Sequence, residues 1–193
     1  MTDKSLSMPV VLVPGFMSPA WMMWPMAKYL QGSFHRVVRW DYPRIFVDLE
    51  VSVTSLADQL SALDSPQIAI VTHSFGDWLT RSALQRIQSP RQIRLISLCP
   101  VTTNVPIVTL TSPLSQYITP ELRIMSQAAS AEVSLPNSLD IRRTVIHAKG
   151  DLLVRQQVAD DQRFVVASHN SVLFQPNVWV LVRDELHKRA AGS

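Results

Sequence analysis

The sequence predicts an α/β fold built on a mostly parallel, doubly wound sheet of about six strands. Three observations support this prediction. First, short runs rich in β-branched residues alternate along the 193-residue chain with stretches of helical periodicity. Second, these runs are almost continuously apolar, as expected for strands that are buried on both faces of a parallel sheet. Third, three of the five glycines lie at or just after the ends of such runs, where the chain has to turn: Gly15, Gly76 and Gly150.

The expected strands are six short segments. They cover residues 10–13, 36–41, 67–72, 94–99, 144–148 and 163–167. Between them, apolar residues three or four positions apart predict helices with one buried face. These residues are Leu56, Leu60 and Leu63, then Trp78, Leu79, Ala83 and Ile87, and, near the end, Val178, Leu181, Val182 and Leu186. Pro176 is suited to the first turn of the last helix.

One segment, residues 100–137, does not follow this alternation. It contains five prolines, many serines and threonines, and one amphipathic stretch over residues 122–129. Two interpretations fit it equally well: an excursion over the sheet that forms a small cap, or an ordinary long connection between two strands. The whole chain, residues 1–193, is expected to form one domain, because its length is typical of a single domain.

The composition excludes several classes of function. Apolar residues make up 47% of the chain and charged residues 17%, which is typical of a globular protein. The formal net charge of +3 comes from scattered basic residues, so no nucleic-acid partner is expected. The sequence contains no motif for a dinucleotide, a nucleoside triphosphate or a zinc-protease site, so we expect no cofactor and no metal.

The cysteine content and the first residues bear on location. Cys99 is the only cysteine, so an intramolecular disulfide cannot form and a zinc site built on paired cysteines is excluded. Residues 1–7 are polar and precede no long apolar segment, so no secretory signal is expected, although a processed secreted form would look the same. Together these features predict a cytoplasmic protein. They leave the oligomeric state open.

The segment around Ser74 has the pattern of a nucleophile elbow. Thr72-His73-Ser74-Phe75-Gly76 follows an expected strand and precedes an expected helix. In such a strand–turn–helix unit, a tight turn lifts the serine hydroxyl clear of the sheet, and small residues are needed where strand and helix nearly touch. Gly76 meets that requirement, whereas Thr72 is larger than the usual glycine. The alternative is a serine that only caps the helix.

A serine nucleophile needs a neighbouring base, and histidine suits this role because it titrates near neutral pH. Among five histidines, His169 follows the last expected strand, in a loop before the final helix. The others are less well placed, namely His35 before a strand, His73 in the elbow but pointing elsewhere, His147 within a strand and His187 on the final helix. Asp151 follows the preceding strand and lies between Ser74 and His169, in the chain order of elbow enzymes. The alternative for Asp151 is a plain turn residue.

The loop after the first strand supplies the rest of the expected site. Gly15-Phe16 follows that strand, and the backbone N–H of Phe16 is expected to form an oxyanion hole with that of Phe75. A plain loop is the alternative. Met17 and Trp21 belong to the apolar run that follows, and we expect them to bind an apolar substrate or to contact a membrane surface or lipid peripherally. The alternative for this run is a helix core.

Together these features resemble the α/β-hydrolase superfamily, and more narrowly its minimal bacterial lipases and esterases. The segments that carry the resemblance are Val11-Leu12-Val13-Pro14-Gly15-Phe16, His73-Ser74-Phe75-Gly76, Gly150-Asp151-Leu152-Leu153-Val154 and Ser168-His169-Asn170. The resemblance implies a minimal α/β-hydrolase fold with a small or absent cap, and a catalytic triad of Ser74, Asp151 and His169. Pro14, Thr72 and Asp77 depart from the pattern of the family.

The predicted activity is hydrolysis of a small-molecule carboxylic ester with an apolar acyl group, through an acyl-enzyme on Ser74. A thioesterase or an acyltransferase would use the same residues with another leaving group or acceptor. A binding domain that has kept the fold is the alternative without catalysis. The complete set of Ser74, Asp151 and His169 favours an enzyme, because a degenerate enzyme usually lacks one of the three.

Overall fold

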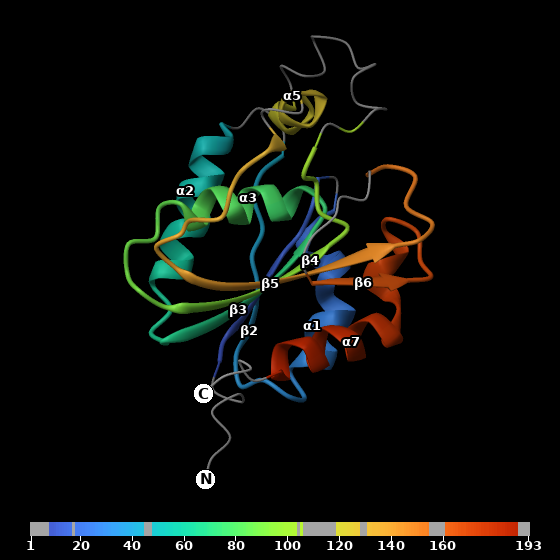
Figure 1. Ribbon diagram of the computed structural model, residues 1–193, viewed down its shortest axis with the longest axis horizontal. Coiled ribbons are helices and arrows are strands. Elements are labelled where there is room, and N and C mark those ends of the chain that lie inside the picture. Colours follow the sequence, from blue (N-terminus) through green and yellow to red (C-terminus); the bar gives the residue numbers. More distant parts are fainter. Residues whose placement is uncertain are drawn as a thin grey trace.

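The computed structural model describes residues 8–16, 18–44, 48–103, 105, 119–127, 131–154 and 161–188. Within these ranges, six parallel strands form one sheet in the order β2-β1-β3-β4-β5-β6 (Figure 1). In chain order they are β1 (Val10–Val13), β2 (Val37–Arg39), β3 (Gln67–His73), β4 (Gln92–Leu98), β5 (Asp140–Ala148) and β6 (Gln162–Val165). The chain begins inside the sheet, moves to one edge and then crosses to the other. The prediction of a doubly wound parallel sheet is therefore confirmed.

All six predicted strands are present; β1 has the predicted bounds, and the other five differ from the prediction. The largest difference is at β5, which begins at Asp140 instead of residue 144. Its first four residues are exposed or half-buried, so an apolar pattern could not reveal them. β4 likewise begins at Gln92, before the predicted start. These residues pair with a neighbouring strand through their backbones, which requires no apolar side chain.

Both faces of the sheet are buried, which explains why the strand sequences are almost continuously apolar. Along β1 the side chains alternate, so that Val11 and Val13 pack into one half of the core and Val10 and Leu12 into the other. Four helices cover these halves (Figure 1), namely α2 (Leu49–Ser61) and α3 (Phe75–Leu84) over the first, and α1 (Trp24–Leu30) and α7 (Pro176–His187) over the second. None of the helices within the described ranges combines the length and the apolar character that a bilayer crossing needs.

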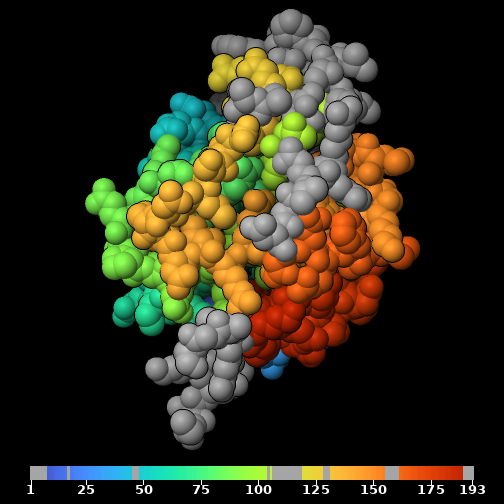
Figure 2. Space-filling view, viewed as in Figure 1, coloured from blue at the N-terminus to red at the C-terminus, as the bar shows by residue number. Residues whose placement is uncertain are grey.

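Between β4 and β5 the described residues include one short helix, α5 (Pro120–Ser126). Its Met125 is buried in the same half of the core as α2 and α3, and Leu122 and Ile124 pack against that half. Figure 2 shows α5, in yellow, on the surface at the top of the view. Residues 104, 106–118 and 128–130 lie outside the described residues. The choice between a cap and a long connection for residues 100–137, and the single domain over residues 1–193, stay predictions.

Candidate active site

Ser74 lies at the turn between β3 and α3, in a backbone conformation that residues other than glycine rarely adopt. Its φ is 52° and its ψ is −123°. Such a conformation costs about 1–3 kcal/mol and persists only where the surrounding structure fixes it. Here the Ser74 N–H donates to the Leu98 carbonyl at 2.9 Å, while the Ser74 carbonyl accepts from the N–H groups of Asp77 and Val101. The turn therefore holds Ser74 in a fixed position at the edge of the sheet.

Gly76 lets this turn pass close to β1. A Cβ atom built on Gly76 would lie 2.4 Å from the carbonyl oxygen of Pro14 and 2.6 Å from that of Val13. Both obstacles are backbone atoms, which cannot rotate away as the end of a flexible side chain could. The strand and the helix thus meet at a distance that only glycine permits.

Gly76→Ala should therefore destabilise the fold. We expect the free energy of unfolding to fall by about 3 kcal/mol, because the added methyl group forces α3 away from β1. Urea unfolding followed by circular dichroism measures this change. Gly32→Ala is the matched control, since the nearest atom to its added Cβ would be the Tyr29 carbonyl oxygen at 3.3 Å. A Gly76→Ala variant that is as stable as this control would contradict the explanation.

Three side chains from three strand ends meet at the turn. Asp151 follows β5, and His169 lies between β6 and the short helix η4 (Ser171–Phe174). The Ser74 Oγ lies 2.9 Å from His169 Nε2, and His169 Nδ1 lies 2.7 Å from Asp151 Oδ2. Ser74 and His169 are almost completely buried, with 6% and 8% of their surfaces exposed. The structure thus joins Ser74, His169 and Asp151 in one line of hydrogen bonds.

The surroundings of Asp151 determine which nitrogen of His169 carries the proton. Asp151 Oδ1 accepts hydrogen bonds from the backbone N–H groups of Leu153 at 2.9 Å and Val154 at 3.0 Å. Burial would raise the pKa of Asp151, but the hydrogen bonds from His169 and from these N–H groups outweigh burial and hold the pKa below its usual value. An ionised carboxylate can only accept, so His169 Nδ1 donates to it. In the neutral ring the lone pair of Nε2 then faces the Ser74 hydroxyl and can take its proton.

The loop after β1 runs beside Ser74. A Cβ atom on Gly15 would lie 2.8 Å from the Ser74 Cβ, so the two segments are too close for a side chain between them. Phe16 follows Gly15 and is half-buried, while Phe75 is the first residue of α3 and is completely buried. Both backbones are therefore close to Ser74, at the end of α3 where the helix dipole is positive. The role of their N–H groups as an oxyanion hole stays a prediction.

The apolar run after this loop combines buried and exposed residues. Met17 lies outside the described residues. Trp21 lies in the short helix η2 (Ala20–Met23), which packs beside η4, and 64% of the Trp21 surface is exposed. Met23, by contrast, is buried in the half of the core that contains α1 and α7. The run thus contributes to the core through Met23 and leaves Trp21 accessible, and substrate binding by Met17 and Trp21 stays a prediction.

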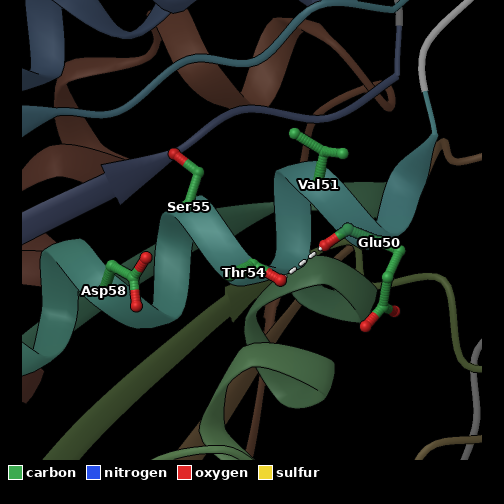
Figure 3. Close-up of a pocket in the computed structure, with 5 residues that line it drawn as sticks. All are labelled: Glu50, Val51, Thr54, Ser55 and Asp58. Carbon is green, nitrogen blue, oxygen red and sulfur yellow. Dashed lines mark hydrogen bonds between the residues drawn. The ribbon is translucent and has the colours of Figure 1, made fainter.

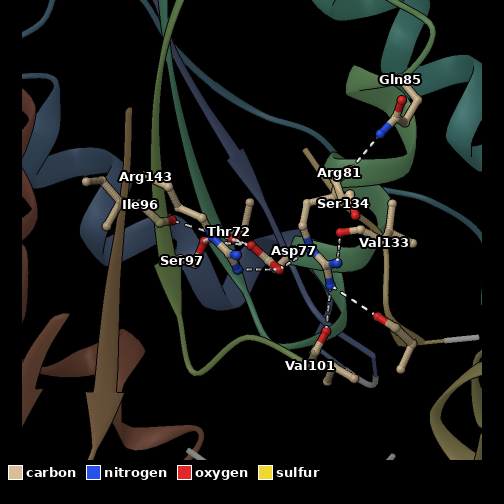
Figure 4. A network of polar contacts seen from close by, with 11 residues as sticks. Thr72, Asp77, Arg81, Gln85, Ile96, Ser97, Val101, Val133, Ser134 and Arg143 are labelled. Carbon is tan, nitrogen blue, oxygen red and sulfur yellow. Dashed lines mark hydrogen bonds and ion pairs between the residues drawn. The ribbon is translucent and has the colours of Figure 1, made fainter. Parts of the chain in front are cut away.

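A buried polar network next to the turn was not predicted from the sequence (Figure 4). Asp77, in the first turn of α3, is fully buried, and its Oδ2 lies 2.7 Å from Arg81 Nε and 2.9 Å from Arg143 Nη2. Its Oδ1 accepts a 2.6 Å hydrogen bond from the Ser97 hydroxyl and lies 3.5 Å from Thr72 Oγ1. Burial would raise the pKa of Asp77, but the two arginines and Ser97 outweigh burial and hold the pKa below its usual value. Thr72 and Asp77, which both depart from the pattern expected of a nucleophile elbow, thus contact each other.

Arg81 links this network to the segment between β4 and β5. Its guanidinium donates to the carbonyls of Val101 at 2.8 Å, Ala131 at 3.4 Å and Val133. Val101 follows β4, while Ala131 and Val133 precede β5. Figure 4 shows Val101 and Val133 beside the Arg81 side chain, so both ends of the segment are tied to α3. The signal available in the sequence was the spacing of Asp77 and Arg81, four residues apart on one helix face.

Two further buried groups lie near the three side chains. The Cys99 Sγ, an Asp151 carboxylate oxygen and a His169 ring nitrogen lie within 4.8 Å of one another. Burial, together with the nearby Asp151, raises the pKa of Cys99 to about 12, so its thiol stays protonated and is a poor nucleophile. His73, which was expected to point away from Ser74, is fully buried and directs its ring at the backbone of His169. Both contacts join distant strand ends, so local sequence patterns could not reveal them.

A pocket of about 340 Å³ on α2 includes none of these side chains (Figure 3). It is lined by Glu50, Val51, Thr54, Ser55 and Asp58. All five residues come from one helix, and the Thr54 hydroxyl donates to the backbone carbonyl of Glu50 in that same helix. The pocket therefore lacks the convergent polar groups from several elements that a catalytic site needs.

The sequence matches no known family profile and no curated protein. Solved structures do share its fold. BorB, a type II thioesterase from the borrelidin biosynthetic cluster, aligns with a TM-score of 0.67 and 17% identity over 94% of this chain and 92% of BorB. Lipase B of Aspergillus fumigatus aligns with a TM-score of 0.64 and 19% identity, over 99% of this chain and 55% of the lipase. The enol-lactonase of Burkholderia xenovorans LB400 aligns with a TM-score of 0.65 and 13% identity, over 94% of this chain and 92% of the lactonase.

Proposed function

We propose that this chain, which has the α/β-hydrolase fold, is a serine hydrolase that cleaves carboxylic esters through an acyl-enzyme on Ser74. The observation that carries the proposal is the line of hydrogen bonds from Ser74 through His169 to Asp151, at 2.9 Å and 2.7 Å. The Ser74 side chain makes no capping hydrogen bond to α3, which disfavours the alternative of a serine that only caps the helix. A base within hydrogen-bond distance of a strained serine is the arrangement that acyl transfer requires.

In the proposed cycle, the Ser74 Oγ attacks the ester carbonyl while His169 Nε2 takes its proton. Asp151 stabilises the resulting imidazolium through the Nδ1–H bond. The tetrahedral intermediate then collapses as Nε2 returns the proton to the departing alkoxide, which leaves as the alcohol. A water molecule, deprotonated by the same nitrogen, attacks the acyl-enzyme and releases the carboxylic acid. Ser74 recovers its proton from His169, so the cycle consumes one ester and one water.

The negative oxygen of each tetrahedral intermediate needs donors that are in place beforehand. The backbone N–H groups of Phe16 and Phe75 are our candidates, because both backbones lie close to Ser74. Removing one donor of this kind from an acyl-transfer enzyme costs about 3–4 kcal/mol of transition-state stabilisation. The positive end of α3 would act on the same charge.

Apolar side chains on the segments that carry the proposed site favour an apolar acyl group. The Phe75 ring stacks on that of Trp78, with centroids 5.2 Å apart. Phe16, from the loop after β1, and Val154, from the loop after Asp151, belong to the same apolar cluster as this pair. Apolar residues thus belong to the segments that carry or adjoin the proposed site, and an acyl chain that packs against them would gain about 25 cal/mol per Å² of apolar surface buried.

A thioesterase is the second candidate, because BorB, a thioesterase, matches almost the whole chain in fold. The same three side chains would serve it, and an acyltransferase as well, with a different leaving group or acceptor. A binding domain without catalysis is disfavoured by the complete hydrogen-bonded set. Ester and thioester cleavage differ in the leaving group, so kinetics can separate them.

A substrate panel tests the proposal. Purified protein is assayed with p-nitrophenyl esters from acetate to decanoate and with acyl-CoA thioesters of the same chain lengths, with Ser74→Ala as the blank. We expect ester turnover well above the blank and a kcat/KM that rises as the acyl chain lengthens. A clear preference for thioesters would assign the second candidate. Folded wild-type protein that turns over neither class would overturn the proposal and favour a binding domain.

A further inference from the structure

We propose that His73 is a positioning residue, whose Nε2–H holds the backbone of His169 so that the base stays within reach of Ser74. The inference rests on the proposed function, because it concerns the base of that reaction. His73 itself touches neither Ser74 Oγ nor the acyl group in the proposed cycle, so its effect would pass through His169.

The contact joins the strand of the nucleophile to the loop of the base. His73 Nε2 lies 2.9 Å from the backbone carbonyl oxygen of His169, and the two ring centroids are 5.0 Å apart. His73 is the last residue of β3 and directly precedes Ser74. His73 and Ser74 therefore hold His169 at two points, because Ser74 binds the His169 ring and His73 binds the His169 backbone.

The chemistry of the contact fixes the proton on one nitrogen of His73. A backbone carbonyl can only accept, so Nε2 must donate. Burial, with the His169 ring beside it, lowers the pKa of His73 to about 3, although Asp151 and the bond to the His169 carbonyl oppose this effect. A neutral ring carries one N–H, which leaves Nδ1 with its lone pair. In the described part of the chain Nδ1 has no hydrogen-bond partner, as this assignment requires.

The His73 ring is fully enclosed by its neighbours. His73 has no exposed surface, and a Cβ atom on Gly15 would lie 3.2 Å from its Nδ1 and 2.8 Å from its carbonyl oxygen. The loop after β1 thus packs against one side of His73, while the loop after β6 accepts its hydrogen bond. One ring therefore sets the spacing between the loop of the candidate oxyanion hole and the loop of the base.

The base's own loop is also held by local hydrogen bonds and by a bond to the loop after β5, in which the Ala167 carbonyl accepts from the Gly150 N–H at 2.9 Å. Ser171 Oγ accepts from the Ser168 N–H at 2.8 Å, and the Val172 N–H donates to the Ser168 carbonyl. These bonds shape the loop but do not tie His169 to β3. Loss of the His73 bond should therefore let His169 shift while the loop keeps its shape, and a shift of about 1 Å can cost up to about 100-fold in rate.

Three variants separate positioning from packing. His73→Gln can place its amide nitrogen near the site of Nε2 and keep the donor, His73→Asn is too short to reach, and His73→Leu fills the space without a donor. His35→Gln is the control, because His35 is exposed and precedes β2, whereas His73 ends a strand. We expect kcat to fall about 10- to 100-fold in His73→Leu and His73→Asn, with KM within about twofold of wild type. The kcat of His73→Gln should be close to that of wild type, and the kcat of His35→Gln should equal it.

Nitrogen-15 NMR of the histidine rings provides a readout that needs no turnover. In wild-type protein we expect His73 to carry its proton on Nε2 at every pH from 5 to 9, and the His169 Nδ1 proton to give a low-field signal. That signal should weaken by exchange in His73→Leu and persist in His73→Gln. A His73 ring protonated on Nδ1, or one that titrates in this range, would overturn the inference.

The two proposals fail in different ways. Unchanged kcat in His73→Leu and His73→Asn, measured beside an active wild type, would refute the positioning role alone. A wild type that cleaves neither esters nor thioesters would refute the proposed function. The His73 tautomer and the exchange of the His169 proton would still decide whether His73 holds His169 in place.

Discussion

Ser74→Ala should lower kcat by about 10⁴- to 10⁶-fold, to the rate left by binding and backbone donors alone. The variant removes the atom that forms the acyl bond, so His169 and Asp151 have no nucleophile to activate. KM should change much less, because the substitution leaves the rest of the site in place. Alanine is no larger than serine, and the Ser74 backbone bonds to Leu98 and Val101 do not involve the hydroxyl. The fold should therefore survive the substitution.

The measurement is ester turnover by wild type, Ser74→Ala and Ser55→Ala, with circular dichroism to confirm folding. Ser55→Ala is the matched control, because Ser55 is exposed on α2 and is no part of the hydrogen-bonded line. It should retain wild-type kcat. A folded Ser74→Ala variant that kept more than about one hundredth of the wild-type kcat would contradict the role of Ser74 as nucleophile.

Asp77→Asn should lower the free energy of unfolding by about 3–5 kcal/mol. The carboxylate lies fully buried between Arg81 and Arg143, and the Arg81 side chain is itself only 3% exposed. The amide keeps the size of the side chain but leaves both guanidinium groups without their counter-charge. Breaking a buried pair in this way costs far more than breaking an exposed one.

The same carboxylate should make stability depend on acid pH. The folded-state pKa of Asp77 lies below its unfolded value of about 4, so its contribution is fully present above that value. It is lost as the pH falls through the folded-state pKa. The free energy of unfolding of wild type should therefore fall more steeply in acid than that of Asp77→Asn. The free energies of the two proteins should converge as the pH falls.

Urea unfolding at pH 7 and at several acid values measures both effects. Asp184→Asn is the control, because Asp184 is half exposed and pairs with Arg183 on the surface of α7. The free energy of unfolding of that variant should fall by less than about 1 kcal/mol. Equal losses in Asp77→Asn and Asp184→Asn would show that the buried network does not stabilise the fold.

Local patterns were enough to predict the sheet and the segments that meet at its edge. Each strand is a short apolar run, because both of its faces are buried, and parallel strands end at a common edge. A serine, an aspartate or a histidine just after such a run therefore has a predictable place. Ser74, Asp151 and His169 were proposed on these grounds, and the structure brings them within hydrogen-bond distance.

Contacts between distant segments could not be predicted in this way. The Asp77 carboxylate binds Arg143, which is 66 residues away and lies in the polar first half of β5. Taken singly, Thr72 and Asp77 look like departures from a glycine pattern, and their contact becomes visible only when α3 is packed on the sheet. The His73 contact likewise joins residues 96 positions apart.

Labelling with a fluorophosphonate is the most direct test of Ser74 as an activated nucleophile. The Ser74 Oγ should attack the phosphorus of the probe, displace fluoride and form a covalent phosphonyl ester, whatever the natural substrate is. Intact mass spectrometry should show one probe per chain, and fragmentation should locate it on Ser74, within the tryptic peptide that ends at Arg81. Ser74→Ala should remain unlabelled. Folded wild-type protein that takes up no probe, or takes it up on another residue, would contradict the account.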